Sequence, residues 1–144
     1  MKKIMGVDYG DARTGVAISD ILCSIVGSTT VIPSRNREKA IADIVNIAKN
    51  NGVTEIVVGL PKNMDGTEGE RAEVIRTFAA MLPEYTTIPY DFYDERMTTM
   101  VAYRFLGETG TYGKKRKDAV DTLSAQIILQ GYIDRERASA GRKG

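Results

Sequence analysis

Residues 3–20 read KIMGVDYG, DAR and TGVAISD, and this stretch decides the fold. The first run predicts a β-strand and the last run its antiparallel partner, with a turn between them. Asp8 stands where a strand would carry an apolar residue, and a buried carboxylate is costly unless a cation or hydrogen-bond donors satisfy it. Because strand side chains alternate, Gly6, Asp8 and Gly10 share one face, where the glycines would leave space for a metal ion or a phosphate. An Asp here is also typical of a strand end that caps a turn.

The size and composition predict one domain. The chain has 144 residues, of which 42% are hydrophobic, enough for a real core. We expect a single domain over residues 1–137, followed by a flexible basic tail over residues 138–144. The sequence has no run long enough to cross a membrane and no secretion-signal pattern at its start. Cys23 is the single cysteine, so we expect no intrachain disulfide, a cytoplasmic location and no membrane partner.

The absence of histidine limits the chemistry. With no histidine in the sequence, His-based acid–base catalysis and the usual zinc sites are excluded. Carboxylates, lysine, tyrosine, hydroxyl groups and one thiol remain. Carboxylate oxygens suit hard cations, so Mg²⁺ or Mn²⁺ is the expected cofactor.

The remaining sequence alternates between strand and helix patterns. Further strands are predicted over residues 24–32, 55–60 and 86–93, and helices over 37–50, 70–82, 100–106 and 118–135. The almost wholly apolar run 55–60 is typical of a strand covered on both faces, as in parallel pairing. The sequence therefore predicts an α/β fold with a mixed five-stranded sheet: three antiparallel N-terminal strands plus two parallel strands, with helices on both faces.

Acidic residues from three parts of the chain are expected to converge. Asp8 ends the first strand, and Glu95 follows the fifth, at the sheet edge where open α/β folds bind ligands. Asp118 and Asp121 open the last helix at i, i+3 spacing and therefore share a face. Each acid also has an ordinary interpretation: Glu95 as a turn residue and Asp118 as a helix cap. Asp121 leads directly into the apolar face of its helix, so a capping role alone explains it less well.

Basic residues accompany the acids and indicate a polyanionic partner. From residue 97 onward, nine Lys and Arg face five Asp and Glu. The residues expected to dock phosphates are Arg13, Arg96, Lys114, Lys115, Arg116 and Lys117. Paired divalent ions held by carboxylates can hydrolyse phosphodiesters, and basic side chains would give salt-sensitive, largely sequence-independent binding of nucleic acid. The alternative for the run at 114–117 is a solvated surface loop.

Several motifs together resemble one known family. They are GVDYG (6–10), RTGVA (13–17), VVGLP (57–61), NMDGT (63–67), DER (94–96), TT (98–99), VD (120–121), SA (124–125) and IIL (127–129). On these motifs, which cover nearly the whole chain, the sequence resembles the bacterial YqgF/RuvX family, whose fold is RNase H-like.

The resemblance implies a nuclease that depends on Mg²⁺ or Mn²⁺, with Asp8, Glu95 and Asp121 as both catalytic residues and metal ligands. It implies 5′-end processing of pre-16S rRNA, or alternatively resolution of four-way DNA junctions by similarity to the RuvC nucleases. Asp118 departs from the family pattern. Many RNase H-like nucleases carry an acid at the end of the strand after the first helix, where this chain has residues 59–61, so Glu95 is implied to substitute from the next strand.

Two other function classes remain open at the level of sequence. The stretch around Asp8 also resembles the first phosphate loop of actin-like and sugar-kinase proteins, although those proteins use two such lobes. A non-catalytic RNA-binding or ribosome-assembly module using the basic loop is the third hypothesis. Nothing in the sequence distinguishes a monomer from a homodimer.

Overall fold

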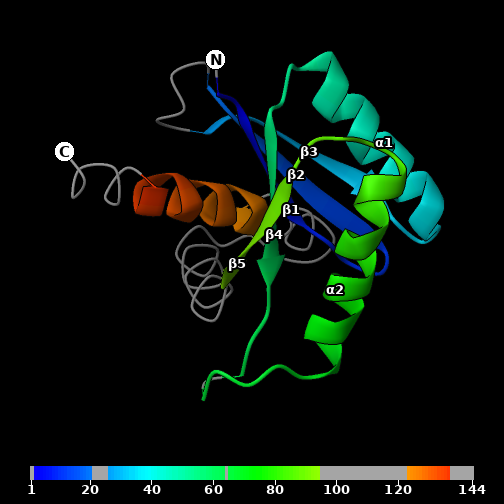
Figure 1. Cartoon of the computed structure of the whole chain (residues 1–144), viewed down its shortest axis with the longest axis vertical. Coiled ribbons are helices and arrows are strands. Elements are labelled where there is room, and N and C mark those ends of the chain that lie inside the picture. The colour runs from blue at the N-terminus through cyan, green and yellow to red at the C-terminus, as the bar shows by residue number, and fades with distance from the viewer. Residues whose placement is uncertain (1, 21–25, 64, 95–122, 137–144) are drawn as a thin grey trace, which may run out of the picture.

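The fold is a mixed five-stranded sheet between helices (Figure 1). It is described by a computed structural model for residues 2–20, 26–63, 65–94 and 123–136. The elements in chain order are β1 (Ile4–Asp8), β2 (Arg13–Ser19), β3 (Val26–Pro33), α1 (Arg37–Asn50), β4 (Glu55–Leu60), α2 (Glu70–Met81), η1 (Leu82–Glu84) and β5 (Tyr90–Asp94). Residues 123–136 are also helical and are called the C-terminal helix here.

The strand order confirms the predicted topology. The sheet runs β3-β2-β1-β4-β5. The first three strands pair antiparallel, whereas β4 pairs parallel with both β1 and β5. The central position therefore belongs to β1, which carries Asp8 at its end.

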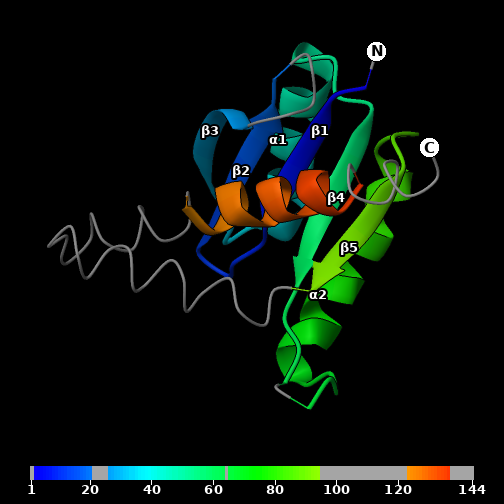
Figure 2. The same cartoon turned by 90° about the vertical axis from the view of Figure 1, so that its left-hand side faces the viewer.

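The two faces of the sheet bury separate cores. Side chains at alternate positions of β1 illustrate this: Met5 and Val7 pack under α1 and α2, whereas Ile4 packs under the C-terminal helix. Figure 2 shows that helix crossing one face while α1 and α2 lie on the other. Helices on both faces were predicted, and this is confirmed. None of the described helices is long and apolar enough to cross a membrane.

Two predicted boundaries are wrong around residue 82. Helix α2 ends at Met81, and a 3-10 turn follows, in which the amides of Tyr85 and Thr86 donate to the carbonyl of Leu82. Strand β5 then begins at Tyr90 and not at Thr86. Thr86 Oγ1 accepts a hydrogen bond from the amide of Ile88 at 3.2 Å, which forms a local turn before the strand starts.

The loop after β4 contains the predicted tight turn. Gly66 has φ of 89°, and the Asp65 carboxylate accepts a hydrogen bond from the amide of Thr67 at 3.0 Å. Other predictions lie outside the described residues: the helix over 100–106, the loop over 107–117, the first residues of the last helix and the tail over 138–144.

Candidate functional site

The described residues hold only part of the predicted site. Asp8 and Arg13 are described. The other predicted site residues lie outside the described residues: Glu95, Arg96, Lys114, Lys115, Arg116, Lys117, Asp118 and Asp121. Within the described ranges no three acidic or cysteine side chains are grouped so that they could hold a metal ion.

Asp8 lies at the carboxyl end of the central strand. It is the last residue of β1, pairs with Gly15 of β2 and is half-buried. Alternation from Ile4 and Gly6 places its side chain on the face covered by the C-terminal helix. The carboxyl ends of parallel β4 and β5 lie at the same edge. Asp8 therefore occupies the position at which open α/β sheets bind ligands.

The glycines beside Asp8 make room for the protein itself, which corrects the expectation that they leave space for a ligand. A Cβ on Gly6 would lie 2.8 Å from Cβ of Leu129 and 3.1 Å from the carbonyl oxygen of Ala125. A Cβ on Gly10 would collide with the carbonyl oxygen of Arg13. Gly6 lets the C-terminal helix approach β1, and Gly10 lets the hairpin close.

Arg13 shares the face and the edge of Asp8. It is the first residue of β2, where Gly15 faces Asp8 across the strand pair. Ala17, two positions further on, packs in the core beneath the C-terminal helix. Because Arg13, Gly15 and Ala17 alternate onto one face, Arg13 lies on the same sheet face as Asp8, and its role in binding phosphate stays a prediction.

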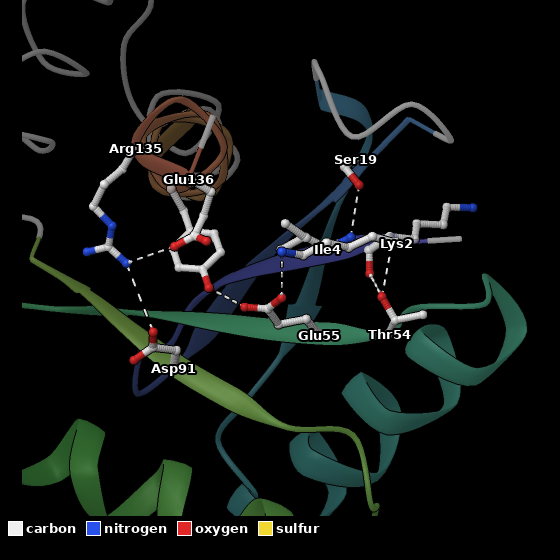
Figure 3. A network of polar contacts seen from close by, with 10 residues as sticks. Lys2, Ile4, Ser19, Thr54, Glu55, Asp91, Arg135 and Glu136 are labelled. Atoms are coloured by element: carbon white, nitrogen blue, oxygen red, sulfur yellow. Dashed lines mark hydrogen bonds and ion pairs between the residues drawn. The ribbon is translucent and has the colours of Figure 1, made fainter. Parts of the chain in front are cut away.

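Polar contacts at the opposite end of the strands hold the C-terminal helix in place (Figure 3). The Tyr132 hydroxyl donates to Glu55 at the start of β4, and Lys2 Nζ lies 3.3 Å from the other oxygen of that carboxylate. Burial, and then the hydrogen bond to Glu55, raise the pKa of Tyr132 above its ordinary value. Arg135 reaches Asp91 of β5 at 4.0 Å. The hydrogen bond from Tyr132 to Glu55 thus ties the helix to β4, and Arg135 extends toward β5.

The helix has a defined direction across the sheet. Ala125 and Leu129 lie against Gly6 of β1, whereas Tyr132 and Arg135 contact β4 and β5. Its described N-terminal end therefore lies over the central strand that carries Asp8. Of the apolar residues that follow Asp121, Ala125 and Ile128 are fully buried, whereas Leu123 and Ile127 are only partly buried.

Sequence reasoning missed a second feature at this edge. A polar pocket of about 550 Å³ lies next to Tyr9, on the side of α1. Its lining residues are Tyr9, Asp11, Ser34, Arg35, Asn36, Arg37 and Glu38. The two arginines on either side of Asn36 were a signal in the sequence, but only the fold brings them beside β1.

Comparison with known proteins gives a consistent result. Residues 2–135 match the model of the RuvX family, described as "Holliday junction resolvase". A "Putative pre-16S rRNA nuclease" of Moorella thermoacetica is 41% identical over 133 residues, covering 92% of this chain and 95% of that protein. A protein of Halothermothrix orenii with the same description is 44% identical over 132 residues, covering 92% of this chain and 94% of that protein.

Solved structures support the fold. The Thermus thermophilus RuvC chain in complex with a Holliday junction substrate gives a TM-score of 0.61 at 9% identity, covering 96% of this chain and 97% of that one. The fowlpox virus resolvase bound to Holliday junction DNA gives a TM-score of 0.58 at 10% identity, covering 92% of this chain and 97% of that one. The predicted RNase H-like fold is confirmed.

Proposed function

The chain belongs to the RuvX family, and from this premise we propose that it hydrolyses phosphodiester bonds of nucleic acid with the help of bound Mg²⁺ or Mn²⁺. We propose Asp8, Glu95 and Asp121 as the ligands and catalytic residues. The curated relatives, which are described as acting on pre-16S rRNA, make the 5′ region of that RNA the favoured substrate. The family description makes four-way DNA junctions the second candidate.

One observation carries the proposal: Asp8 lies on the sheet face that also carries Tyr93, two residues before Glu95, and the described start of the C-terminal helix, which follows Asp121 in the sequence. Tyr93 lies on the face of the C-terminal helix, beside Gly131, and Asp94 ends β5. Continued alternation would bring Glu95 onto the face of Asp8.

Asp121 is constrained from the other side. It precedes Ala125 by four residues, a span of at most about 14 Å. The carbonyl of Ala125 lies over Gly6, and Asp8 is about 7 Å further along β1. A chain segment of this length is long enough to bring Asp121 to Asp8, as a shared site requires.

The donor set fits a hard divalent ion. Carboxylate oxygens are ligands that Mg²⁺ and Mn²⁺ accept, and Asp8 is half-buried at a strand end, where its position is set by the sheet. Such ions, when bound, activate water and stabilise the leaving oxygen. Arg13, on the same face, would hold a phosphate beside the carboxylates. Arg96 and the lysines and arginine of residues 114–117 would extend this electrostatic contact along the strand.

The test is a cleavage panel with the Asp8→Asn variant. Substrates are an RNA spanning the 5′ end of 16S rRNA with its precursor sequence, a four-way DNA junction and an unstructured single strand, each with Mn²⁺. We expect Asp8→Asn to reduce cleavage at least about a hundredfold, because loss of a group that merely supports a ligand already costs 10- to 100-fold. The matched control is Asp43→Asn on α1, which should cleave like the native protein.

A second readout separates metal binding from activity. Mn²⁺ should raise the melting temperature of the native protein and of Asp43→Asn, and should raise that of Asp8→Asn less. Undiminished cleavage by a pure Asp8→Asn preparation would refute the proposed site. RNA binding without cleavage under any divalent metal would instead favour the binding-module hypothesis.

A further inference from the structure

The pocket beside Tyr9 has the chemistry of a phosphate-backbone contact. Its lining is polar except for Tyr9, whereas pockets for small ligands are mostly apolar and enclose their ligand. Tyr9 is 5% exposed and its ring stacks on Phe78 at 4.2 Å between centroids, so it offers no face on which a base could stack. The pocket therefore suits an anion that is recognised without reading bases.

Two carboxylates line the pocket, Asp11 and Glu38, and the one in the turn that follows β1 is paired. Asp11 forms an ion pair with Arg71 at 3.0 Å, and Arg71 also donates to the carbonyl oxygen of Tyr9. This arrangement fixes Arg71 of α2 against the backbone that directly follows Asp8. It also removes the carboxylate that would most directly repel a phosphate entering beside β1.

Two other guanidinium groups remain available there. Arg35 is exposed and forms no ion pair with any residue of the described ranges. Within the same ranges Arg37 forms one side-chain hydrogen bond, from its Nε to the Tyr9 hydroxyl at 3.4 Å. The cap of α1 is filled by the Asn36 side chain, which accepts from the amide of Lys39 at 3.0 Å. The anion-binding capacity of this pocket thus comes from the two arginines, whose planar donors match phosphate oxygens.

The pocket is continuous with the proposed active site through the backbone. Tyr9 follows Asp8 directly, and consecutive Cα atoms are about 3.8 Å apart. Alternation directs Asp8 toward the C-terminal helix and Tyr9 toward α1 and α2. A strand cleaved at Asp8 can therefore pass over the end of β1 and reach the arginines on the far side.

We propose that Arg35 and Arg37 form a second phosphate-binding subsite, which holds the backbone of the nucleic-acid substrate where it leaves the active site across the end of β1. This inference rests on the proposed function for its ligand, and its test does not depend on cleavage. The subsite contributes affinity and positioning, independent of base sequence.

The experiment compares two double variants that remove equal charge. Arg35→Gln/Arg37→Gln changes the pocket. Lys3→Gln/Lys49→Gln removes two charges far from the pocket, one directly before the start of β1 and one in the last turn of α1. Binding of labelled single-stranded RNA is followed by fluorescence anisotropy in EDTA, over a series of salt concentrations, with thermal melts to show that each variant is folded.

We expect the pocket variant to weaken RNA binding about tenfold at 0.1 M salt, and to lower the slope of log K against log salt by about 1.4, since each lost single-strand phosphate contact is worth about 0.7. The control should change both quantities much less. Equal effects of the two double variants would overturn the inference, as would loss of free nucleoside triphosphate binding in the pocket variant with no change in RNA binding.

The cleavage and RNA-binding assays together distinguish failure of the proposed function from failure of the proposed subsite. If the native protein cleaves no substrate but the pocket variant alone weakens RNA binding, the subsite stands and the nuclease proposal falls. If the native protein cleaves RNA and the pocket variant binds it with unchanged affinity and salt slope, the nuclease proposal stands and the subsite falls. A single Arg35→Gln variant, at an exposed position, checks that effects do not come from disturbed helix packing.

Discussion

The two faces of the sheet are closed in different ways. Beneath α1 and α2 the core consists of large apolar side chains, among them Phe78, Ile41, Ile44 and Ile75, all at most 2% exposed. On the other face a single described helix lies against backbone at Gly6 and is held by Tyr132 and Glu55.

The difference separates stability from positioning. Apolar packing on the α1 and α2 face is extensive but tolerates small displacements, since burial is non-directional. On the face of the C-terminal helix, the close backbone approach at Gly6 and the directional hydrogen bond from Tyr132 to Glu55 act in addition to apolar packing. Since Asp8 lies on that face, we expect stability to reside mainly in the first face and the geometry of catalysis in the second.

The largest expected effect on stability is Phe78→Ala. The side chain is fully buried and stacks on Tyr9 with an interplanar angle of 15°. Truncating a buried phenylalanine costs about 3–5 kcal/mol of unfolding free energy. Urea titration measures this loss. Cleavage per folded molecule should remain close to native at low temperature, because the substitution leaves the helix face intact.

Phe92→Ala is the matched control for that substitution. Phe92 lies on the same face but is only partly buried, so its truncation should destabilise the protein less. Equal losses for the two variants would contradict the assignment of stability to the interior of the first core.

Gly6→Ala should act in the opposite sense, with a smaller stability cost and a larger functional one. The added methyl group would lie 2.8 Å from Cβ of Leu129, so the C-terminal helix must shift. Overpacking of this kind costs about 1–3 kcal/mol. Because the helix leads back to Asp121, cleavage measured on fully folded protein should fall as well.

Gly27→Ala provides the comparison for Gly6→Ala. Among the described residues, the nearest atom to its Cβ would be the amide nitrogen of Asp20 at 3.3 Å, and Gly27 is exposed on the edge strand β3. We expect native cleavage from this variant. If Gly6→Ala cleaves as well as Gly27→Ala, the close approach of the helix does not position the site.

The same contrast explains what the sequence could predict. Strand β4 and helix α1 have the predicted bounds, Glu55–Leu60 and Arg37–Asn50, because hydrophobic periodicity and turn residues encode local structure directly. The predicted start of β5 was wrong because a local turn at Thr86 competes with strand pairing. Strand propensity alone does not reveal that competition.

The site was predictable only in part for a related reason. Asp8 stood out as a charge in an apolar strand, and Arg13 as a cation close to Asp8 in the sequence. The role of Gly6 depends on Leu129, more than a hundred residues away in the sequence, and the pocket of Arg35 and Arg37 depends on α1 meeting β1. Such contacts between distant segments have no local signature. The predicted roles of Glu95 and Asp121 stay predictions.

A smaller effect is expected for Tyr132→Phe, and it should depend on pH. The variant loses the hydrogen bond to Glu55, worth about 1.5–3 kcal/mol when the partner is charged. Burial and Glu55 raise the pKa of Tyr132, whereas in the unfolded chain the phenol ionises near its ordinary value of about 10. Above that pH the unfolded state loses its proton first, so the stability contributed by the native phenol falls as the pH rises.

Chemical denaturation from pH 7 to pH 11 tests this pH dependence. The difference in unfolding free energy between native protein and Tyr132→Phe should be constant below about pH 10 and should shrink above it. Tyr85→Phe is the control, since Tyr85 is 36% exposed. A difference that grows with rising pH would show that the phenol is not held neutral in the folded protein.

The smallest expected effect is Arg135→Gln, which distinguishes charge pairing from ring contact on the helix face. Arg135 lies 4.0 Å from Asp91 and 3.9 Å from Glu136, with its side chain half exposed, so these ion pairs should add little. Its guanidinium also lies 5.0 Å from the centroid of the Tyr132 ring and 5.7 Å from that of Tyr93. Contacts of this kind at exposed sites contribute about 0.5–1 kcal/mol. We therefore expect Arg135→Gln to lose about that much stability. Added salt screens exposed ion pairs strongly. If the loss comes from the ring contacts and not from ion pairs, it should change little between about 0.1 M and about 1 M salt. Asp91→Asn removes the ion pair between Arg135 and β5 and leaves both rings in place, so it should hardly change the free energy of unfolding. A larger, salt-sensitive loss of stability in Asp91→Asn would mean that charge pairing holds this end of the helix.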